Sequence, residues 1–303
     1  MIRIGSRGSQ LALWQANHTA DALRGAGHEV NIEIIRTTGD ALQGVAFNKV
    51  GTKGMFTKEI EEALLDNRID LAVHSLKDLP TELEAPFAIA AIPPRVDPRD
   101  AFVSVEHDSF AALPPGARIG TSSLRRQSQL RAQRRDIQLV EFRGNVDTRL
   151  RKLSEGIVDA AILASAGLER LGRTECIREW FSPLVLCPAP GQGALAIETR
   201  ADDIQTLTAV AFLDDPASRF AVTAERATLA ALGGGCHVPI GVYCEPSPQG
   251  YTVTGVVAHP DGSALVRAEL EHQHDQSADE LGQRLAESLL EQGAREILGA
   301  VQL

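Results

Sequence analysis

Residues 117–163 read ARIGTSSLRRQSQLRAQRRDIQLVEFRGNVDTRLRKLSEGIVDAAIL, a stretch in which short apolar runs alternate with amphipathic segments. The apolar runs predict strands over Ala117–Gly120, Ile137–Arg143 and Asp159–Leu163. The segments between them predict helices over Ser123–Arg134 and Val146–Glu155. Because alternating strands and helices are typical of α/β architecture, this stretch sets the expected fold class.

The same alternation runs through the N-terminal third, which predicts a second α/β block. Ser9 stands where a helix N-cap is expected. The predicted strands and helices of this block are Ile2–Ser6, Gln10–Arg24, Val30–Arg36, Phe56–Asn67, Ile69–His74 and Ile89–Ile92, with Leu195–Thr199 as a later strand. No internal repeat is evident in the sequence.

The last third has a different pattern, with consecutive strands enclosed by helices. The predicted elements are a helix over Asp215–Leu232, strands over Val238–Glu245, Tyr251–His259 and Leu265–Glu271, and a long closing helix over Ser277–Leu298. A run of antiparallel strands followed by a helix indicates a small α+β domain. Candidate junctions between domains are Pro93-Pro94, Pro188–Gly193 and Asp214–Pro216.

Composition excludes several classes of protein. The 303 residues are 44% hydrophobic, enough for two or three domains, and the net charge of −10 disfavours nucleic acid and anionic membranes as partners. No apolar run is long enough to span a bilayer. The four cysteines lack C-x-x-C spacing, so neither a zinc site nor a disulfide framework is predicted. The first residues lead directly into a strand without a signal peptide, so we expect a cytosolic location.

Cationic segments follow two of the predicted strands. Gly120–Arg126 combines three hydroxyl side chains and two arginines at the start of a helix, where free N–H groups favour anions. Arg143–Leu150 repeats this arrangement, and Arg149 borders the apolar stripe of its helix. The alternatives are ordinary capping with solvated arginines for the first segment and an internal salt bridge for the second.

Three further segments also allow either a ligand-binding or a purely structural interpretation. His74–Pro80 leaves a buried strand and contains Lys77 beside Asp78, so it fits either a ligand site at a strand end or a loop ion pair. Gly44–Gly54, with Lys49 and Lys53, fits either a cationic lid or a flexible surface loop. Arg7-Gly8-Ser9 is another possible anion site between a strand and a helix.

Cys236 lies in the glycine-rich passage Leu232–Gly241. Glycines at 233–235 free the backbone and leave the sulfur uncovered by neighbouring side chains. A lone cysteine beside glycine is often incidental. Together with the cationic strand ends, however, it suggests a cleft for a ligand with several carboxylates, next to a nucleophilic thiol.

These motifs together resemble the porphobilinogen deaminase family, also called hydroxymethylbilane synthases, over essentially the whole chain. The motifs that carry the resemblance are Arg7–Gln15, Val50–Gly54, Ala72–Asp78, Asp97–Phe102, Gly120–Arg126, Arg143–Leu150, Pro190–Ala194 and Gly234–Gly241. So many motifs in one order are highly specific.

The resemblance implies a three-domain enzyme. Domain 1 would comprise residues 1–93 and 194–214, domain 2 residues 94–193, and domain 3 residues 215–303. Domains 1 and 2 would be α/β domains like the type II periplasmic-binding proteins, with an active-site cleft between them. Domain 3 would be the small α+β domain that carries the cysteine.

The resemblance also implies the reaction and its cofactor. Four porphobilinogen molecules are deaminated and joined head to tail on a dipyrromethane cofactor, and hydrolysis then releases hydroxymethylbilane. Cys236 matches the cysteine that holds this cofactor through a thioether. Loss of ammonia gives an azafulvene cation, which a carboxylate stabilises, and Asp78 matches the family's catalytic aspartate. The expected partners are porphobilinogen and the growing oligopyrrole, with a monomeric protein.

Because each pyrrole carries an acetate and a propionate, the product gains two negative charges per step. The resemblance assigns cofactor binding to Ser75, Lys77, Asp78, Thr121, Ser123, Arg125, Arg126, Arg143 and Gly144, besides Cys236. It assigns substrate binding to Arg7, Ser9, Gln15, Lys53, Arg149, Arg170 and Gln192. Lys49 matches a lid lysine, and His237 stands where several members have glutamine. No metal site is expected.

Two other functions fit parts of the sequence. A non-catalytic protein that binds carboxylate ligands shares the implied fold, but it has no use for an activated cysteine or a third domain. A cysteine hydrolase that used Cys236 with His237 is poorly arranged, because adjacent side chains on a strand point to opposite faces.

Overall fold

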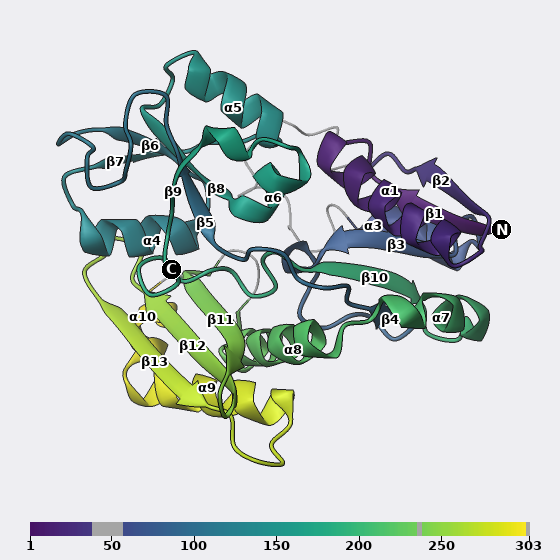
Figure 1. Ribbon diagram of the computed structural model, residues 1–303. Coiled ribbons are helices and arrows are strands. Elements are labelled where there is room, and N and C mark those ends of the chain that lie inside the picture. The colour runs from purple at the N-terminus through teal and green to yellow at the C-terminus, as the bar shows by residue number, and fades with distance from the viewer. Residues whose placement is uncertain (38–56, 235–237, 301–303) are drawn as a thin grey trace. The chain divides into compact units, whose positions relative to one another are not determined.

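The computed structural model describes residues 1–37, 57–234 and 238–300, which form two compact units (Figure 1). The first unit comprises Met1–Arg95 and Ala194–Ser218, and the second comprises Val96–Gly193 and Arg219–Leu303. The chain therefore crosses from one unit to the other three times.

The first unit is built on a five-stranded mixed sheet. In spatial order its strands are β2 (Val30–Ile34), β1 (Ile2–Ser6), β3 (Leu71–Ser75), β10 (Leu195–Arg200) and β4 (Phe87–Ala91). β1 pairs in parallel with β2 and β3, whereas β10 runs antiparallel to β3 and β4. The carboxyl ends of β1, β2 and β3 therefore share one edge of the sheet.

Helices cover both faces of this sheet. The helices are α1 (Gln10–Gly25), α3 (Lys58–Leu65) and α7 (Ile204–Val210), with short 3₁₀ turns η2 (Leu76–Asp78) and η4 (Ala211–Leu213). Leu71 and Val73 pack with α1 and α7 on one face, and Ala72 between them packs with α3 on the other. This alternation along β3 is what a strand buried on both faces requires.

The second unit contains a sheet of the same kind. Its strands in spatial order are β7 (Gln138–Val140), β6 (Arg118–Gly120), β8 (Ala160–Ala164), β5 (Asp100–Val103) and β9 (Ile177–Trp180). β6 is parallel to β7 and β8, and β5 is antiparallel to β8 and β9.

Its helices also lie on both faces. They are α4 (Leu124–Gln133), α5 (Val146–Ser154) and α6 (Ser165–Arg170), followed by the 3₁₀ turn η3 (Thr174–Cys176). α4 packs on the face that carries Phe102 and Ile119, and α5 and α6 pack on the face that carries Ala101 and Leu163.

The two five-stranded sheets have the same strand arrangement and also share one arginine–aspartate contact. In the first, the Arg3 backbone N–H donates to Asp70 Oδ2 at 2.7 Å, and its Nη2 donates to Oδ1 at 2.6 Å. In the second, Arg118 makes the same two bonds to Asp159 at 2.7 Å each. Both arginines lie near the start of the first of the three parallel strands of their sheet, β1 and β6, and both aspartates directly precede the third, β3 and β8.

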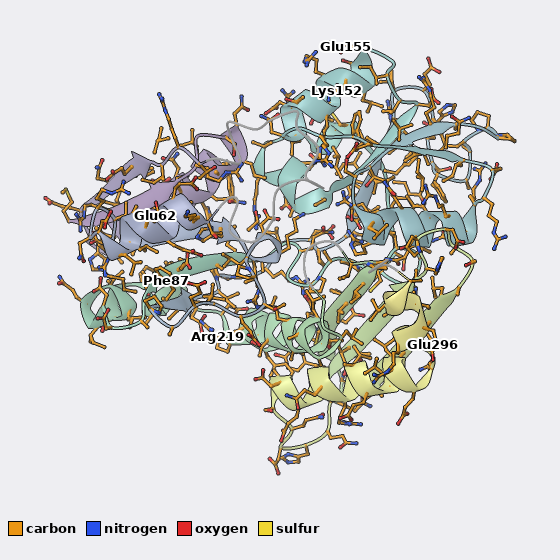
Figure 2. All side chains as sticks on the ribbon, turned by 180° about the vertical axis from the view of Figure 1, so that it is seen from behind. Glu62, Phe87, Lys152, Glu155, Arg219 and Glu296 are labelled. Carbon is orange, nitrogen blue, oxygen red and sulfur yellow. The ribbon has the colours of Figure 1, made fainter. Side chains whose placement is uncertain are left out.

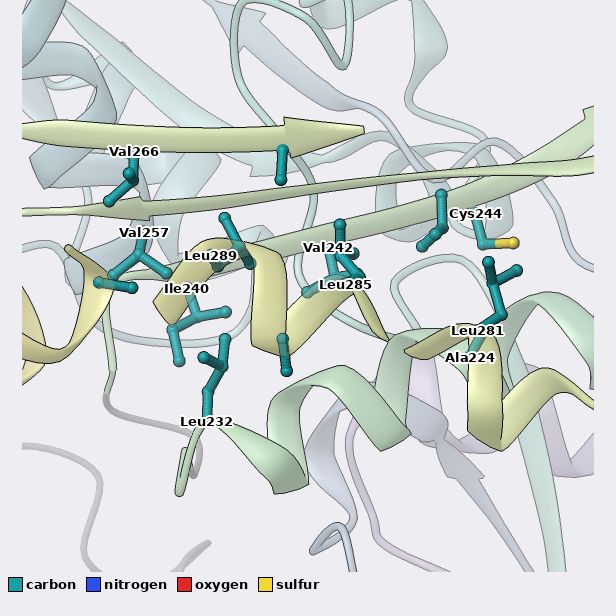
Figure 3. Close-up of a cluster of buried hydrophobic side chains, with 14 of the residues drawn as sticks. Ala224, Leu232, Ile240, Val242, Cys244, Val257, Val266, Leu281, Leu285 and Leu289 are labelled. Atoms are coloured by element: carbon teal, nitrogen blue, oxygen red, sulfur yellow. The ribbon is translucent and has the colours of Figure 1, made fainter. Parts of the chain in front are cut away.

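A smaller antiparallel sheet completes the second unit. It consists of β11 (Ile240–Ser247), β12 (Gly250–Ala258) and β13 (Leu265–Glu271), with helices α8 (Pro216–Ala231), α9 (Ala278–Glu291) and α10 (Ala294–Gly299). Figure 3 shows their common core, in which Leu281, Leu285 and Leu289 of α9 lie with Val242 and Val257 of the sheet. Ser277 begins α9 with a capping box that includes Glu280.

The expected fold class is confirmed: two α/β sheets are followed by a small antiparallel sheet with helices. The prediction of one closing helix over Ser277–Leu298 was wrong, because Gly293 adopts a positive φ of 100° and separates α9 from α10. Strands β5 and β9 and helices α6 and α7 were not predicted. They are short, and β5 begins with a buried charged residue, Asp100, which hides its apolar pattern.

The division of the second unit into domain 2 and domain 3 stays a prediction. Among the described residues, no helix has both the length and the apolar composition needed to cross a membrane.

We predict that Gly282→Ala destabilises the second unit, because α8 and α9 approach closely at this residue. A Cβ on Gly282 would lie 2.3 Å from the Ala224 carbonyl oxygen and 2.8 Å from the Ala227 Cβ. Overpacking of this kind costs about 1–3 kcal/mol, measurable by urea unfolding. The matched control is Gly25→Ala at the end of α1, where a Cβ meets nothing within 4 Å. Equal stability of the two variants would show that the contact tolerates a methyl group.

Candidate functional site

In the first unit, predicted site residues gather at the carboxyl ends of β1 and β3. Arg7 and Ser9 follow β1, and Ser75 ends β3. Lys77 and Asp78 form the η2 turn that comes next, where Lys77 is half-buried and Asp78 is exposed. Because β1 and β3 are parallel neighbours, these groups share one sheet edge, which is where α/β sheets bind ligands.

The turn that carries Lys77 and Asp78 is held at three consecutive residues. His74 Nε2 lies 2.9 Å from Glu198 Oε2, and both side chains are buried. Gln15, also buried, donates from Nε2 to Ser75 Oγ at 2.8 Å, and the Leu76 N–H donates to the Ala194 carbonyl at 3.0 Å. A short turn anchored in this way presents its polar side chains in a defined place.

In the second unit, the loops after β6 and β7 are joined by hydrogen bonds. The Thr121 N–H donates to the Val140 carbonyl at 3.0 Å, and the Phe142 N–H donates to Ser122 Oγ at 2.8 Å. Thr121 is buried and Ser123 is the N-cap of α4. These bonds bring Thr121 and Ser123 close to the following residues, Arg143 and Gly144.

The loop after β7 positions a half-buried arginine. Arg143 Nε donates to Glu141 Oε1 at 2.6 Å, and the Arg143 carbonyl accepts from Lys152 Nζ at 3.0 Å. Lys152 lies on α5 (Figure 2). Gly144 has a φ of +120°, and a Cβ there would lie 2.7 Å from Thr148, so glycine is needed at this turn. Arg149 is half-buried on α5, which begins after Asn145 as N-cap.

Arg125 and Arg126 are buried against Asp100. Arg125 Nη1 donates to Asp100 Oδ2 at 2.7 Å, and Arg126 donates to Oδ1 from Nη2 at 2.7 Å and from Nε at 3.0 Å. The alternative of solvated arginines is therefore wrong, although Ser123 does cap the helix. Burial alone would raise the pKa of the Asp100 carboxyl, but the charges of the two arginines outweigh it and hold that pKa well below its usual range.

Arg170 and Gln192 are also buried in the second unit. Arg170, on the helix after β8, donates from Nη2 to the Gly193 carbonyl at 2.6 Å, and burial lowers the pKa of its guanidinium to about 10. Gln192 Nε2 donates to Asp100 Oδ1 at 2.9 Å and to the Pro98 carbonyl at 2.7 Å.

Four predicted residues, Lys49, Lys53, Cys236 and His237, lie outside the described residues. The three cysteines that the structure does describe are poor nucleophiles. Burial raises the pKa of the Cys187 thiol to about 12. Burial, together with the neighbouring Glu175, also raises the pKa of the Cys176 thiol, and Cys244 is buried.

Each sheet thus presents cations and hydrogen-bond donors at the carboxyl ends of its parallel strands. In each unit by itself, this chemistry suits carboxylate or phosphate groups. Among the described residues, no group of three or more His, Cys, Asp or Glu side chains is arranged to hold a metal ion.

Two buried carboxylates were not assigned a role from the sequence. Asp100 lies within a motif, Asp97–Phe102, that was noted for its resemblance alone. Glu198 stands within a strand that is otherwise mostly apolar, Leu195–Arg200. A charge in such a strand needs a partner, and this signal could have pointed to both residues.

Comparison with protein families gives two matches that cover most of the chain. The model described as "Porphobilinogen deaminase, dipyromethane cofactor binding domain" matches residues 2–208. The model described as "Porphobilinogen deaminase, C-terminal domain" matches residues 219–291, which include β11, β12 and β13.

Full-length relatives agree with these matches. The porphobilinogen deaminase of Nitratidesulfovibrio vulgaris is 48% identical over 98% of this chain and 96% of its own length. That of Roseiflexus sp. strain RS-1 is 50% identical over 97% of both chains. A solved periplasmic substrate-binding protein of an ABC transporter from Coxiella burnetii has 15% identity and a TM-score of 0.43, over 72% of this chain and 94% of its own.

The lowered pKa of Asp100 predicts how stability changes with pH. A carboxyl whose pKa is lower in the folded state stabilises the fold above its unfolded pKa of about 4. That contribution is lost as the pH falls from about 4 toward the folded pKa. In urea unfolding between about pH 7 and pH 3, we expect Asp100→Asn to be less stable than wild type at neutral pH and to lose less stability on acidification. Equal pH slopes for the two proteins would contradict this assignment.

Proposed function

This chain belongs to the porphobilinogen deaminase family, and from that premise we propose which of its residues carry out the reaction. The activity is that of porphobilinogen deaminase, or hydroxymethylbilane synthase, an enzyme of tetrapyrrole biosynthesis. Its cofactor is dipyrromethane and its substrate is porphobilinogen. Membership of an enzyme family sets aside the alternative of a non-catalytic binding protein.

Asp78 is the proposed catalytic carboxylate. Positive charge develops on porphobilinogen as its aminomethyl group leaves as ammonia, and a carboxylate beside the pyrrole N–H stabilises that charge and holds the proton. The support is its place on the η2 turn, which is anchored by His74, Ser75 and Leu76. Lys77, beside it, supplies a cation for a ligand carboxylate.

Cys236 is the proposed point of covalent attachment of the dipyrromethane. It matches the cofactor cysteine of the family, and the described cysteines are buried or half-buried. The donors of the second unit suit a group with several carboxylates, because Thr121, Ser123, Arg125, Arg126, Arg143 and Gly144 gather at one sheet edge. Ser75 is the proposed hydroxyl donor from the first unit. When bound, the dipyrromethane supplies the pyrrole carbon that starts the chain.

The remaining residues are proposed to hold the carboxylates of the substrate and the growing product. Arg7, Ser9 and Gln15 come from the first unit, and Arg149, Arg170 and Gln192 come from the second. Lys53 belongs to this set by its match to the family alone. The observation that supports this set best is the matching topology of the two sheets. Each sheet places cationic side chains after the carboxyl ends of its own parallel strands. The monomeric state and the cytosolic location stay predictions.

We predict that Cys236→Ser yields a folded protein without the covalent cofactor. Serine keeps the size of the side chain but lacks the sulfur that forms the thioether. Intact-mass measurement should give the bare polypeptide for the variant and a heavier species for wild type. The control is Cys244→Ser, which should carry the adduct as wild type does. A bare mass for active wild-type protein would refute the attachment.

We predict that Asp78→Asn keeps the cofactor but loses most turnover, at least about 100-fold, because an amide neither stabilises the cation nor accepts the proton. The measurements are the intact mass and the rate of porphobilinogen consumption. Asp66→Asn, on an exposed aspartate of the same unit, is the control and should leave the rate unchanged. Turnover by Asp78→Asn within a few-fold of wild type would remove Asp78 from the catalytic role.

A further inference from the structure

Asp100 is a fully buried carboxylate at the ligand-binding edge of the second unit's larger sheet. It is the first residue of β5 and pairs in register with Ala164, the last residue of β8. Its two oxygens accept four hydrogen bonds, one from Arg125, two from Arg126 and one from Gln192, at 2.7–3.0 Å. The Asp100 carboxylate therefore binds two arginines, Arg125 and Arg126, that are proposed to hold the cofactor.

The two arginines that share Asp100 are not equivalent. All three nitrogens of the Arg126 guanidinium are engaged, Nε and Nη2 with Asp100 and Nη1 with the Ile162 carbonyl at 2.8 Å. Arg125 uses Nη1 for both Asp100 and the Cys187 carbonyl. Its Nε is buried and has no hydrogen-bond partner in the described part of the chain. A buried donor left in this state is unfavourable, so it is a natural place for a ligand oxygen.

We propose that Asp100 is a positioning residue for the cofactor: it fixes the guanidinium of Arg125 so that Nε remains to bind one carboxylate of the dipyrromethane. Arg126 and Gln192 hold Asp100 in place, and Gln192 thus acts through Asp100. This inference rests on the proposed function, since it takes the dipyrromethane as the anion. It adds a residue that the family resemblance did not assign.

The test compares the fraction of purified protein that carries the cofactor, by intact mass, with the urea midpoint of the same preparation. Asp100→Asn removes the charge, and Asp100→Glu keeps it. We expect Asp100→Asn to reduce the loaded fraction at least tenfold and Asp100→Glu to restore part of it. Asp159→Asn is the matched control, because Asp159 also binds an arginine through two oxygens but lies before the amino end of β8. It should lose stability and remain fully loaded.

Two results would overturn the proposal. One is a folded Asp100→Asn with wild-type loading. The other is loading that follows the urea midpoint alone across the three variants, Asp159→Asn included. If Asp100→Asn does not fold, Asp100→Glu provides the test. Glutamate keeps the charge, but its longer side chain shifts the carboxylate, so wild-type cofactor loading of this variant would contradict a positioning role for Asp100. A wild-type protein with no adduct would instead contradict the proposed function, so the two failures are distinguishable.

Discussion

One buried carboxylate shared by two guanidinium groups is the constraint on which the second unit depends. Asp100 joins the start of β5 to the first turns of α4, which follows β6, and Gln192 joins the same carboxylate to the segment before β10. Removing such a carboxylate leaves buried cations without a counterion, which costs about 3–5 kcal/mol. The same contacts therefore hold Arg125 and Arg126 buried after the carboxyl end of β6.

The duplicated sheet explains how a chain with a net charge of −10 can bind an anionic product. Each sheet places the carboxyl ends of three parallel strands at one edge, and each edge carries cations and helix N-termini. Net charge describes the whole surface, whereas a ligand responds to the local field. An oligopyrrole that gains two carboxylates per step needs several cations, and each sheet edge by itself carries more than one.

Sequence reasoning succeeded where local pattern decides structure. The strands around residues 117–163 and the N-cap Ser9 follow from local apolar runs and capping, whereas Ser123, predicted as the first helical residue, is the N-cap of α4. It failed for Asp100 and for Glu198 with His74, because their partners lie 25 to 124 residues away. It also missed the duplication: Arg3-Ile4-Gly5 and Arg118-Ile119-Gly120 are identical, but three residues are too few to signal a repeat until the ion pairs with Asp70 and Asp159 are seen.

The central claim is that an anionic chain grows, one pyrrole at a time, on a protein whose strand-end cations hold its carboxylates. The most direct test is the intact mass of the wild-type enzyme before and shortly after addition of porphobilinogen. We predict a loaded species at the start and then a ladder of equal increments, one for each condensed unit, that disappears as product is released. A mass that stays unchanged during turnover would contradict this account, because the product would then be assembled free of the protein.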